Sequence, residues 1–113
     1  MPKRTTPLPG RPVRGSRTGR PIMALLDLLG RRWTLRVVWE LRDMPLTSRA
    51  LREACDDASP TVINERLAEL REAGLVEKLD AGGYRLTASG RELMALVLPL
   101  QTFADRWPFK AAR

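Results

Sequence analysis

The chain has 113 residues, a formal net charge of +7, one cysteine and no histidine. This length suits a single domain with a modest core. Without histidine the commonest general base and metal ligand is missing, and Cys55 alone can form neither a disulfide framework nor a zinc cluster. The sequence also lacks a glycine-rich phosphate loop and paired acids in a recognisable spacing. We therefore expect no enzyme, no catalytic residue, no metal site and no cofactor.

Residues 1–20 carry most of the excess charge. They hold six basic residues and no acid, whereas residues 21–113 have a net charge of only +1. Prolines and glycines separate the basic residues, so we expect a disordered basic arm. Such an arm on a near-neutral body favours a polyanion as partner, and nucleic acid rather than a membrane, because the arm has no apolar face to insert. Its candidate phosphate contacts are Arg11, Arg14, Arg17 and Arg20.

A short amphipathic helix is predicted after the arm. Apolar residues recur at the spacing i, i+3, i+4 and i+7, and Gly30 ends the stripe. Asp27 interrupts the apolar run, which argues against a signal peptide, and no stretch approaches the roughly 18 apolar residues that span a bilayer. We therefore expect a cytoplasmic protein without a membrane partner. The stripe consists of Ile22, Leu25, Leu26 and Leu29.

Two further helices are predicted before the middle of the chain. The first covers about residues 32–42, and its inward residues are expected to be Leu35, Val38, Trp39 and Leu41. Pro45 follows it, and Thr47 or Ser48 can cap a third helix that runs to about Cys55. A turn at residues 56–58 then leads into the next helix.

The helix that starts at Pro60 is predicted to be a recognition helix. Ser59 can cap its free N–H groups, Pro60 suits the first helical position, and Gly74 can take the left-handed turn that ends it. An ordinary amphipathic helix with a solvated polar face would show the same pattern, so the surrounding elements must decide. One face holds Ile63, Leu67 and Leu70, and the opposite face holds Thr61, Glu65, Ala68 and Glu72, flanked by Asn64 and Arg71.

A hairpin is predicted next, with strands at residues 75–79 and 84–86. Gly82 and Gly83 between them permit the positive φ angles of a tight turn. Two short helices joined by a turn and followed by such a wing define the fold class. We expect a mainly α protein with a small β-hairpin wing, a winged helix-turn-helix.

The last helix is predicted to start near Thr87 or Ala88 and to kink at Pro99. Its apolar stripe is wider than a terminal helix on a small domain needs. This width favours a dimer interface shared with the first helix, and plain core packing is the alternative. The expected interface residues are Ile22, Leu25, Leu26, Leu96, Leu100, Phe103 and Trp107.

Several runs of residues stand in a specific order: Leu28-Leu29-Gly30-Arg31-Arg32-Trp33-Thr34-Leu35, the capped helix from Ser59 to Leu70, Gly74-Leu75-Val76, and Tyr84-Arg85-Leu86-Thr87-Ala88-Ser89-Gly90-Arg91. Together they resemble the HxlR-type bacterial transcriptional regulators over about residues 21–107. The resemblance implies a fold similar to that of the multiple-antibiotic-resistance regulators. It also implies operator binding as a homodimer that assembles through the first and last helices.

The sequence departs from that family pattern in places. Arg20 stands where many members carry a cysteine, which in some senses thiol-reactive electrophiles, so the resemblance does not extend to sensing of that kind. Cys55 stands at a usually aliphatic position and is expected to be a buried structural thiol, with a reactive sensor as the alternative. Ser48 replaces a frequent aromatic residue. The wing is shorter than usual and has few basic residues at its tip.

The chain is thus expected to comprise the arm (residues 1–20), a winged domain with dimerisation helices at both ends (residues 21–107) and a short tail (residues 108–113). A dimer would place two recognition helices in successive major grooves about 34 Å apart, which predicts an inverted-repeat operator. Asn64 can pair with adenine and Glu65 with cytosine, while Ser59 and Thr61 hold phosphates. The arm can enter an adjacent minor groove. Further backbone contacts are expected from Thr47, Ser48, Arg49, Arg52, Lys78 and Arg85.

Two alternatives remain at this stage. Arg52 and Arg85 could instead form salt bridges with Glu53 or Glu77. The near-neutral body also permits a winged-helix protein-interaction module without specific DNA binding. No residue pattern indicates which small-molecule effector, if any, is sensed.

Overall fold

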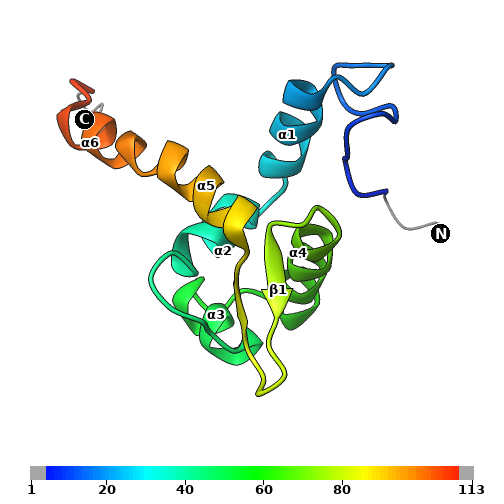
Figure 1. Cartoon of the computed structure of the whole chain (residues 1–113). Helices are drawn as coiled ribbons and strands as arrows, with labels where there is room; N and C mark the ends of the chain where they lie inside the picture. Colours follow the sequence, from blue (N-terminus) through cyan, green and yellow to red (C-terminus); the bar gives the residue numbers. More distant parts are fainter. Residues whose placement is uncertain (1–4, 110–113) are drawn as a thin grey trace.

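The computed structural model describes residues 5–109. Residues 1–4 of the expected arm and residues 110–113 of the expected tail lie outside the described residues. The elements follow one another in the order predicted (Figure 1). They are α1 (Pro21–Leu29), α2 (Thr34–Glu40), α3 (Ser48–Ala54), α4 (Pro60–Glu72), β1 (Val76–Lys78), β2 (Tyr84–Leu86), α5 (Ala88–Val97) and α6 (Pro99–Arg106). The predicted fold class, a mainly α winged helix-turn-helix, is confirmed.

Local capping interactions set the ends of three helices. The hydroxyl groups of Thr47, Ser59 and Thr87 accept hydrogen bonds from the backbone N–H three residues later, at 3.0, 3.5 and 3.1 Å. Each bond satisfies one of the N–H groups that a helix N-terminus leaves without an internal partner. Gly74, with φ +76°, takes the left-handed turn just after α4. These residues lie at the helix ends that the sequence predicts.

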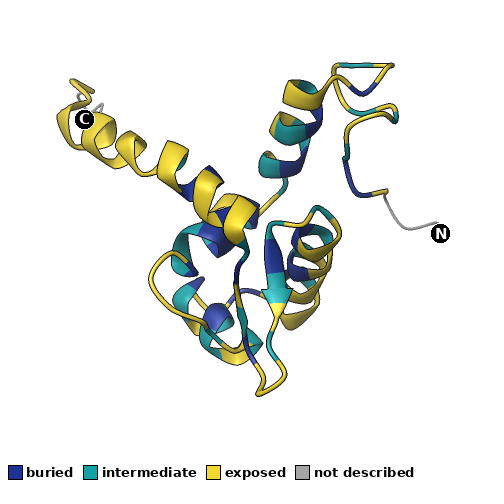
Figure 2. Cartoon of the chain, viewed as in Figure 1, coloured by how far each residue is buried: buried dark blue, intermediate teal, exposed yellow. Residues whose placement is uncertain are grey.

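The core is formed by α2, α3 and α4 together with the hairpin and the inner face of α5 (Figure 2). Leu51, Ile63 and Leu70 are fully buried. The expectation that Leu35 points inward is wrong, because its side chain is 40% exposed. The other expected inward residues agree with the structure: Val38 and Leu41 are buried and Trp39 packs partly buried against the core, with Val37 fully buried beside them. A left-handed Trp33 precedes α2, which starts at Thr34.

The wing is a short antiparallel hairpin. β1 pairs with β2 in the register Val76 to Leu86, and both Gly82 and Gly83 have φ +92° as the turn requires. Leu46 and Tyr84 exchange backbone hydrogen bonds of 2.8 and 3.0 Å. The segment before α3 therefore fixes the base of the wing to the helical body.

Both ends of the chain project from this core. In Figure 1, α5 and α6 extend away from the body on one side, and α1 stands above α4 on the other. The last helix is interrupted at Leu98, between the end of α5 and the start of α6 at Pro99. Pro99 has no N–H to continue the ladder, so the interruption lies where the sequence predicts a kink. No helix among residues 5–109 has both the length and the hydrophobicity to cross a bilayer.

The described part of the arm, which its composition predicts to be disordered when free, lies against the body. Residues 5–20 follow turns stabilised by backbone hydrogen bonds such as Val13 N–H to Ser16 C=O, at 2.9 Å. Their hydrogen bonds to the body include Arg11 to Glu72 at 3.1 Å, Arg31 to the Thr5 carbonyl at 2.8 Å, and Arg14 N–H to Asp27 at 3.0 Å. The body thus supplies polar partners that the isolated arm lacks.

Candidate nucleic-acid interface

The turn between α3 and α4 holds the two helices of the motif at a fixed angle. Asp56 and Asp57 both adopt left-handed conformations, with φ +55° and +57°. Short polar side chains such as Asp tolerate this region better than most residues. Arg52 donates from Nε to the Ala58 carbonyl at 3.1 Å. This arginine, expected to contact the DNA backbone, therefore also stabilises the turn.

The polar face of α4 is open to solvent over its N-terminal half. Thr61, Asn64 and Glu65 are exposed, whereas Ile63 and Leu67 on the other side are buried. The apolar face thus fixes the helix against the core while the polar side chains project outward. Glu65 also accepts a hydrogen bond from its neighbour Arg66 at 3.2 Å. Three of the four residues expected to meet DNA at this helix therefore lie together on one accessible surface, and the fourth, the capping Ser59, is also exposed.

The arm borders the C-terminal half of the same helix. A cavity of about 500 Å³ is lined by Thr5, Thr6, Glu65, Ala68 and Glu72, so the arm runs beside the outer face of α4. Thr6 is only 7% exposed. Hydrogen bonding by the Thr6 side chain, and then by Arg11, lowers the pKa of Glu72 below its ordinary value. Sequence patterns did not indicate this contact, because Arg11 and Glu72 are 61 residues apart.

The residues expected to contact the DNA backbone differ in their exposure and in their partners within the protein. Thr47 caps α3, Ser48 is half-buried, and Arg49 and Lys78 are exposed. Arg85 donates from Nε to Glu77 at 2.8 Å across the hairpin, which is the salt bridge considered as its alternative role. Neither Arg49 nor Lys78 takes part in an ion pair with any residue of the described range.

An ion network that sequence reasoning missed connects the α1–α2 junction to α4. The carboxylate of Glu69 accepts a hydrogen bond from Arg31 and lies 3.3 Å from Nε of Arg66. All three side chains are nearly buried, with exposed fractions of 10%, 12% and 13% for Arg31, Glu69 and Arg66. Since charges in such surroundings are poorly screened, this network fixes the orientation of α4 relative to α1. Arg31 belongs to the resemblance motif, but its partner is 38 residues away.

Most of the projecting α5 and α6 is coloured as exposed in Figure 2, and large apolar residues are among these exposed positions. Leu96 is 73% exposed, and Phe103 and Trp107 stack with their ring centroids 6.1 Å apart. An uncovered surface of this kind is unusual on a soluble monomer. Leu25 is only half-buried rather than exposed. Besides Leu96, the exposed residues of the expected interface are Ile22, Leu26, Leu100, Phe103 and Trp107.

The remaining arginines of the arm form no ion pair with α4. Arg14, Arg17 and Arg20 are exposed, and the backbone N–H of Arg14 bonds to Asp27 of α1, whereas Arg11 is half-buried against Glu72. The structure therefore does not bring all four arm arginines to one surface.

A capped helix with an accessible polar face, a preceding helix joined by a tight turn, and a hairpin wing define a winged-helix transcriptional regulator. The sequence pattern of the HxlR-like helix-turn-helix family matches residues 28–111, and the chain belongs to this family. The resemblance seen in the sequence is thereby confirmed.

Solved structures agree with this assignment. The crystal structure of quinone-bound YodB from B. subtilis has a TM-score of 0.69 at 30% identity, and covers 75% of this chain and 96% of that one. A possible HxlR family transcriptional factor from Thermoplasma volcanium GSS1 has a TM-score of 0.65 at 25% identity, with coverages of 72% and 78%. A MarR-family protein from Porphyromonas gingivalis W83, with 18% identity and a TM-score of 0.68, shares the fold. No curated protein sequence matches the chain.

Proposed function

We propose that this regulator acts in the cytoplasm as a homodimer that binds an inverted-repeat DNA operator in a sequence-specific manner. The observation that carries the proposal is the exposed face of Thr61, Asn64 and Glu65 on α4. A helix that is anchored by one buried face and presents short polar groups on the other fits the major groove of B-DNA.

Two of these side chains are suited to reading bases. The amide of Asn64 can form a bidentate pair with adenine, and the carboxylate of Glu65 can accept from cytosine N4. Glu65 would have to give up its 3.2 Å contact with Arg66 or share it with the base. Because Arg66 also pairs with Glu69, it keeps a partner when Glu65 turns to DNA.

The remaining candidates would fix the position of the duplex through its phosphates. Ser59 and Thr61 at the start of α4 present a hydroxyl beside a helix N-terminus, which favours anions. To contact phosphates, Arg52 and Arg85 would have to share or release their hydrogen bonds to the Ala58 carbonyl and the Glu77 carboxylate. The other groups proposed for this role are Thr47, Ser48, Arg49 and Lys78, and the arm residues Arg11, Arg14, Arg17 and Arg20.

Dimerisation is supported by the uncovered apolar side chains of α1, α5 and α6. A symmetric pairing of two copies through this surface would remove it from water and would place two α4 helices on one duplex. The proposed interface comprises Ile22, Leu25, Leu26, Leu96, Leu100, Phe103 and Trp107.

The test begins with selection of the fragments that the protein binds from its source genome, which yields the operator and its half-site spacing. Asn64→Ala and Glu65→Ala are then compared with the parent on operator and scrambled duplexes. Removal of one base-reading group should reduce discrimination by about 1–3 kcal/mol, or roughly 5- to 150-fold. The matched controls Gln101→Ala and Glu92→Ala, at exposed positions on α6 and α5, should leave discrimination unchanged. If both α4 variants discriminate as well as the parent, base reading by this helix is refuted.

The second candidate function is a protein-interaction module without specific DNA binding. The near-neutral charge of residues 21–113 favours it, because DNA-binding surfaces are usually strongly positive. A gel-shift of the chain lacking residues 1–20 separates the two functions. The body of a DNA-binding regulator should still prefer operator over scrambled DNA, whereas an interaction module should bind neither.

A further inference from the structure

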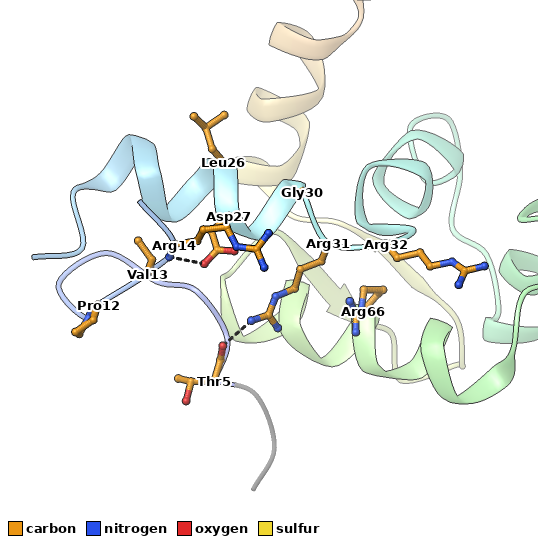
Figure 3. Close-up of a pocket in the computed structure, with 10 residues that line it drawn as sticks. All are labelled: Thr5, Pro12, Val13, Arg14, Leu26, Asp27, Gly30, Arg31, Arg32 and Arg66. Carbon is orange, nitrogen blue, oxygen red and sulfur yellow. Dashed lines mark hydrogen bonds between the residues drawn. The ribbon is translucent and has the colours of Figure 1, made fainter. Parts of the chain in front are cut away.

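A cavity of about 530 Å³ lies between the arm, α1, the α1–α2 junction and α4 (Figure 3). Four arginines line it, from three separate parts of the chain, and Asp27 is the acid among the lining residues. The cavity is distinct from the outward face of α4 proposed to read bases. The four are Arg14, Arg31, Arg32 and Arg66.

Positive charge is in excess at the bottom of this cavity. Arg31 and Arg66 are nearly buried and share a single nearly buried carboxylate, that of Glu69. The other acid near Arg66 is Glu65, whose side chain is 51% exposed and screened by water. Two poorly hydrated guanidinium groups therefore face one comparable negative charge, and an added anion would balance them.

Hydrogen-bonding capacity is unused at the same place. Among residues 5–109, Nε of Arg66 and Oε1 of Glu69 are both buried without a hydrogen bond of good geometry, and they face each other as an ion pair at 3.3 Å. Buried donors of this kind are rare in folded proteins and cost free energy unless a ligand or water satisfies them.

Arg14 adds a third cation at the mouth. Its backbone N–H, not its side chain, bonds to Asp27, and its guanidinium lies on the same side of the cavity as that of Arg31 in Figure 3. Arg32 extends away from both in this view. Val13 and Pro12 supply an apolar part of the wall. The lining thus joins guanidinium groups to a small hydrophobic surface.

We propose that this cavity binds a small organic anion, namely a phosphate or carboxylate group attached to an apolar body. Guanidinium groups hold such oxyanions through paired N–H···O bonds, which are stronger when water is excluded. Arg14, Arg31 and Arg66 hold the anionic group, and Val13 and Pro12 contact the apolar body. Binding at this site does not require DNA.

Binding at this site also offers a way to regulate operator binding, and this regulatory step rests on the proposed function. Arg31 connects the α1–α2 junction to α4 through Glu69. An anion that engages Arg31 and Arg66 competes with Glu69 for them and so loosens the orientation of α4 between the two halves of a dimer. Occupancy of the cavity should then weaken operator binding.

The test uses the full chain and calorimetric titration without DNA, with phenyl phosphate, phenylacetate and inorganic phosphate as probes and benzyl alcohol as the uncharged control. Phenyl phosphate should bind more tightly than inorganic phosphate, and benzyl alcohol should not bind. Shifts of the Arg31 and Arg66 Nε–Hε signals in NMR spectra should report the location. No binding, or equal affinities for phenyl phosphate and inorganic phosphate, would overturn the assignment.

A matched pair of arm variants tests whether Arg14 belongs to the binding site. Arg14→Gln should weaken phenyl phosphate binding about tenfold, because it loses a charged hydrogen bond. Arg17→Gln removes the same charge from an exposed arm position outside the lining and should change binding less than twofold. Equal losses in both variants would mean diffuse attraction to the arm and would refute the site.

Operator affinity measured with saturating phenyl phosphate tests the regulatory step separately. An undiminished operator affinity refutes that step. A failure to bind operator without probe refutes the proposed function and leaves the site standing.

Discussion

At the scale of single residues, Cys55 shows how burial decides chemical behaviour. Its side chain is fully buried in the core at the end of α3. Burial raises the pKa of the thiol, and the nearby positive charge of Arg36 only partly opposes this effect. Since the thiolate is the reactive form, a raised pKa and a closed environment both reduce reactivity. The structure favours a packing role for Cys55 over the sensor considered as its alternative.

Labelling with iodoacetamide tests this behaviour. Between pH 7 and 8, native Cys55 should react at least about tenfold more slowly than the same residue in guanidinium, because a pKa raised above that of a free thiol lowers the thiolate fraction. The native rate should still be rising with pH above the ordinary thiol pKa. Mass spectrometry of timed samples gives both rates. A native rate equal to the denatured one would identify Cys55 as a reactive thiol after all.

At the scale of elements, the wing carries a salt bridge that bears on its proposed DNA contact. Arg85 and Glu77 are paired at 2.8 Å, and their side chains are 51% and 44% exposed. A pair so close to water contributes little to stability. Its main effect is to place a negative charge beside a cation proposed to meet phosphate.

Glu77→Gln should therefore raise affinity for DNA, by about fivefold, if the freed charge is worth roughly 1 kcal/mol. The gain should appear on operator and scrambled duplexes alike, because phosphate contacts carry no sequence information. Fluorescence anisotropy at fixed salt measures it, with Glu92→Gln on α5 as the control for the change in net charge. Unchanged affinity would exclude Arg85 from the interface.

The arm is the element with the largest proposed electrostatic effect. Replacement of Arg11, Arg14, Arg17 and Arg20 by Gln keeps its length and removes most of its charge. The slope of log affinity against log salt should flatten by about 0.9 for each phosphate that the arm no longer neutralises. Titrations between about 50 and 200 mM salt provide the comparison. An identical slope for parent and variant would show that the arm does not touch phosphate.

At the scale of the whole molecule, the exposed aromatic side chains near the C-terminus dominate the proposed dimer surface. Trp107 is 58% exposed and stacks against Phe103, with an interplanar angle of 27°. Trp107→Asp should give a monomer in sedimentation velocity, because it buries a charge in an apolar interface. Gln101→Asp adds the same charge at another exposed position of α6 and should remain a dimer. If the Trp107 variant also sediments as a dimer, the interface lies elsewhere.

The sequence by itself determined the elements and the face of α4 that points outward. These features depend on interactions between residues three or four positions apart, such as the hydroxyl caps at Thr47, Ser59 and Thr87. A left-handed glycine, here Gly74, likewise needs no distant partner. Local rules of this kind can be read directly from residue spacing.

Only the tertiary structure decided which polar side chains are already engaged and where the arm lies. The pairing of Arg31 with Glu69, the contact of Arg11 with Glu72 and the bond from Arg52 to the Ala58 carbonyl all follow from how elements meet in space. The exposure of Leu35 has the same origin, because the turn at Trp33 sets the rotation of α2 against the core. Charge and periodicity along a chain do not encode distances between elements, so the cavity between the arm and α4 became visible only when the chain was folded.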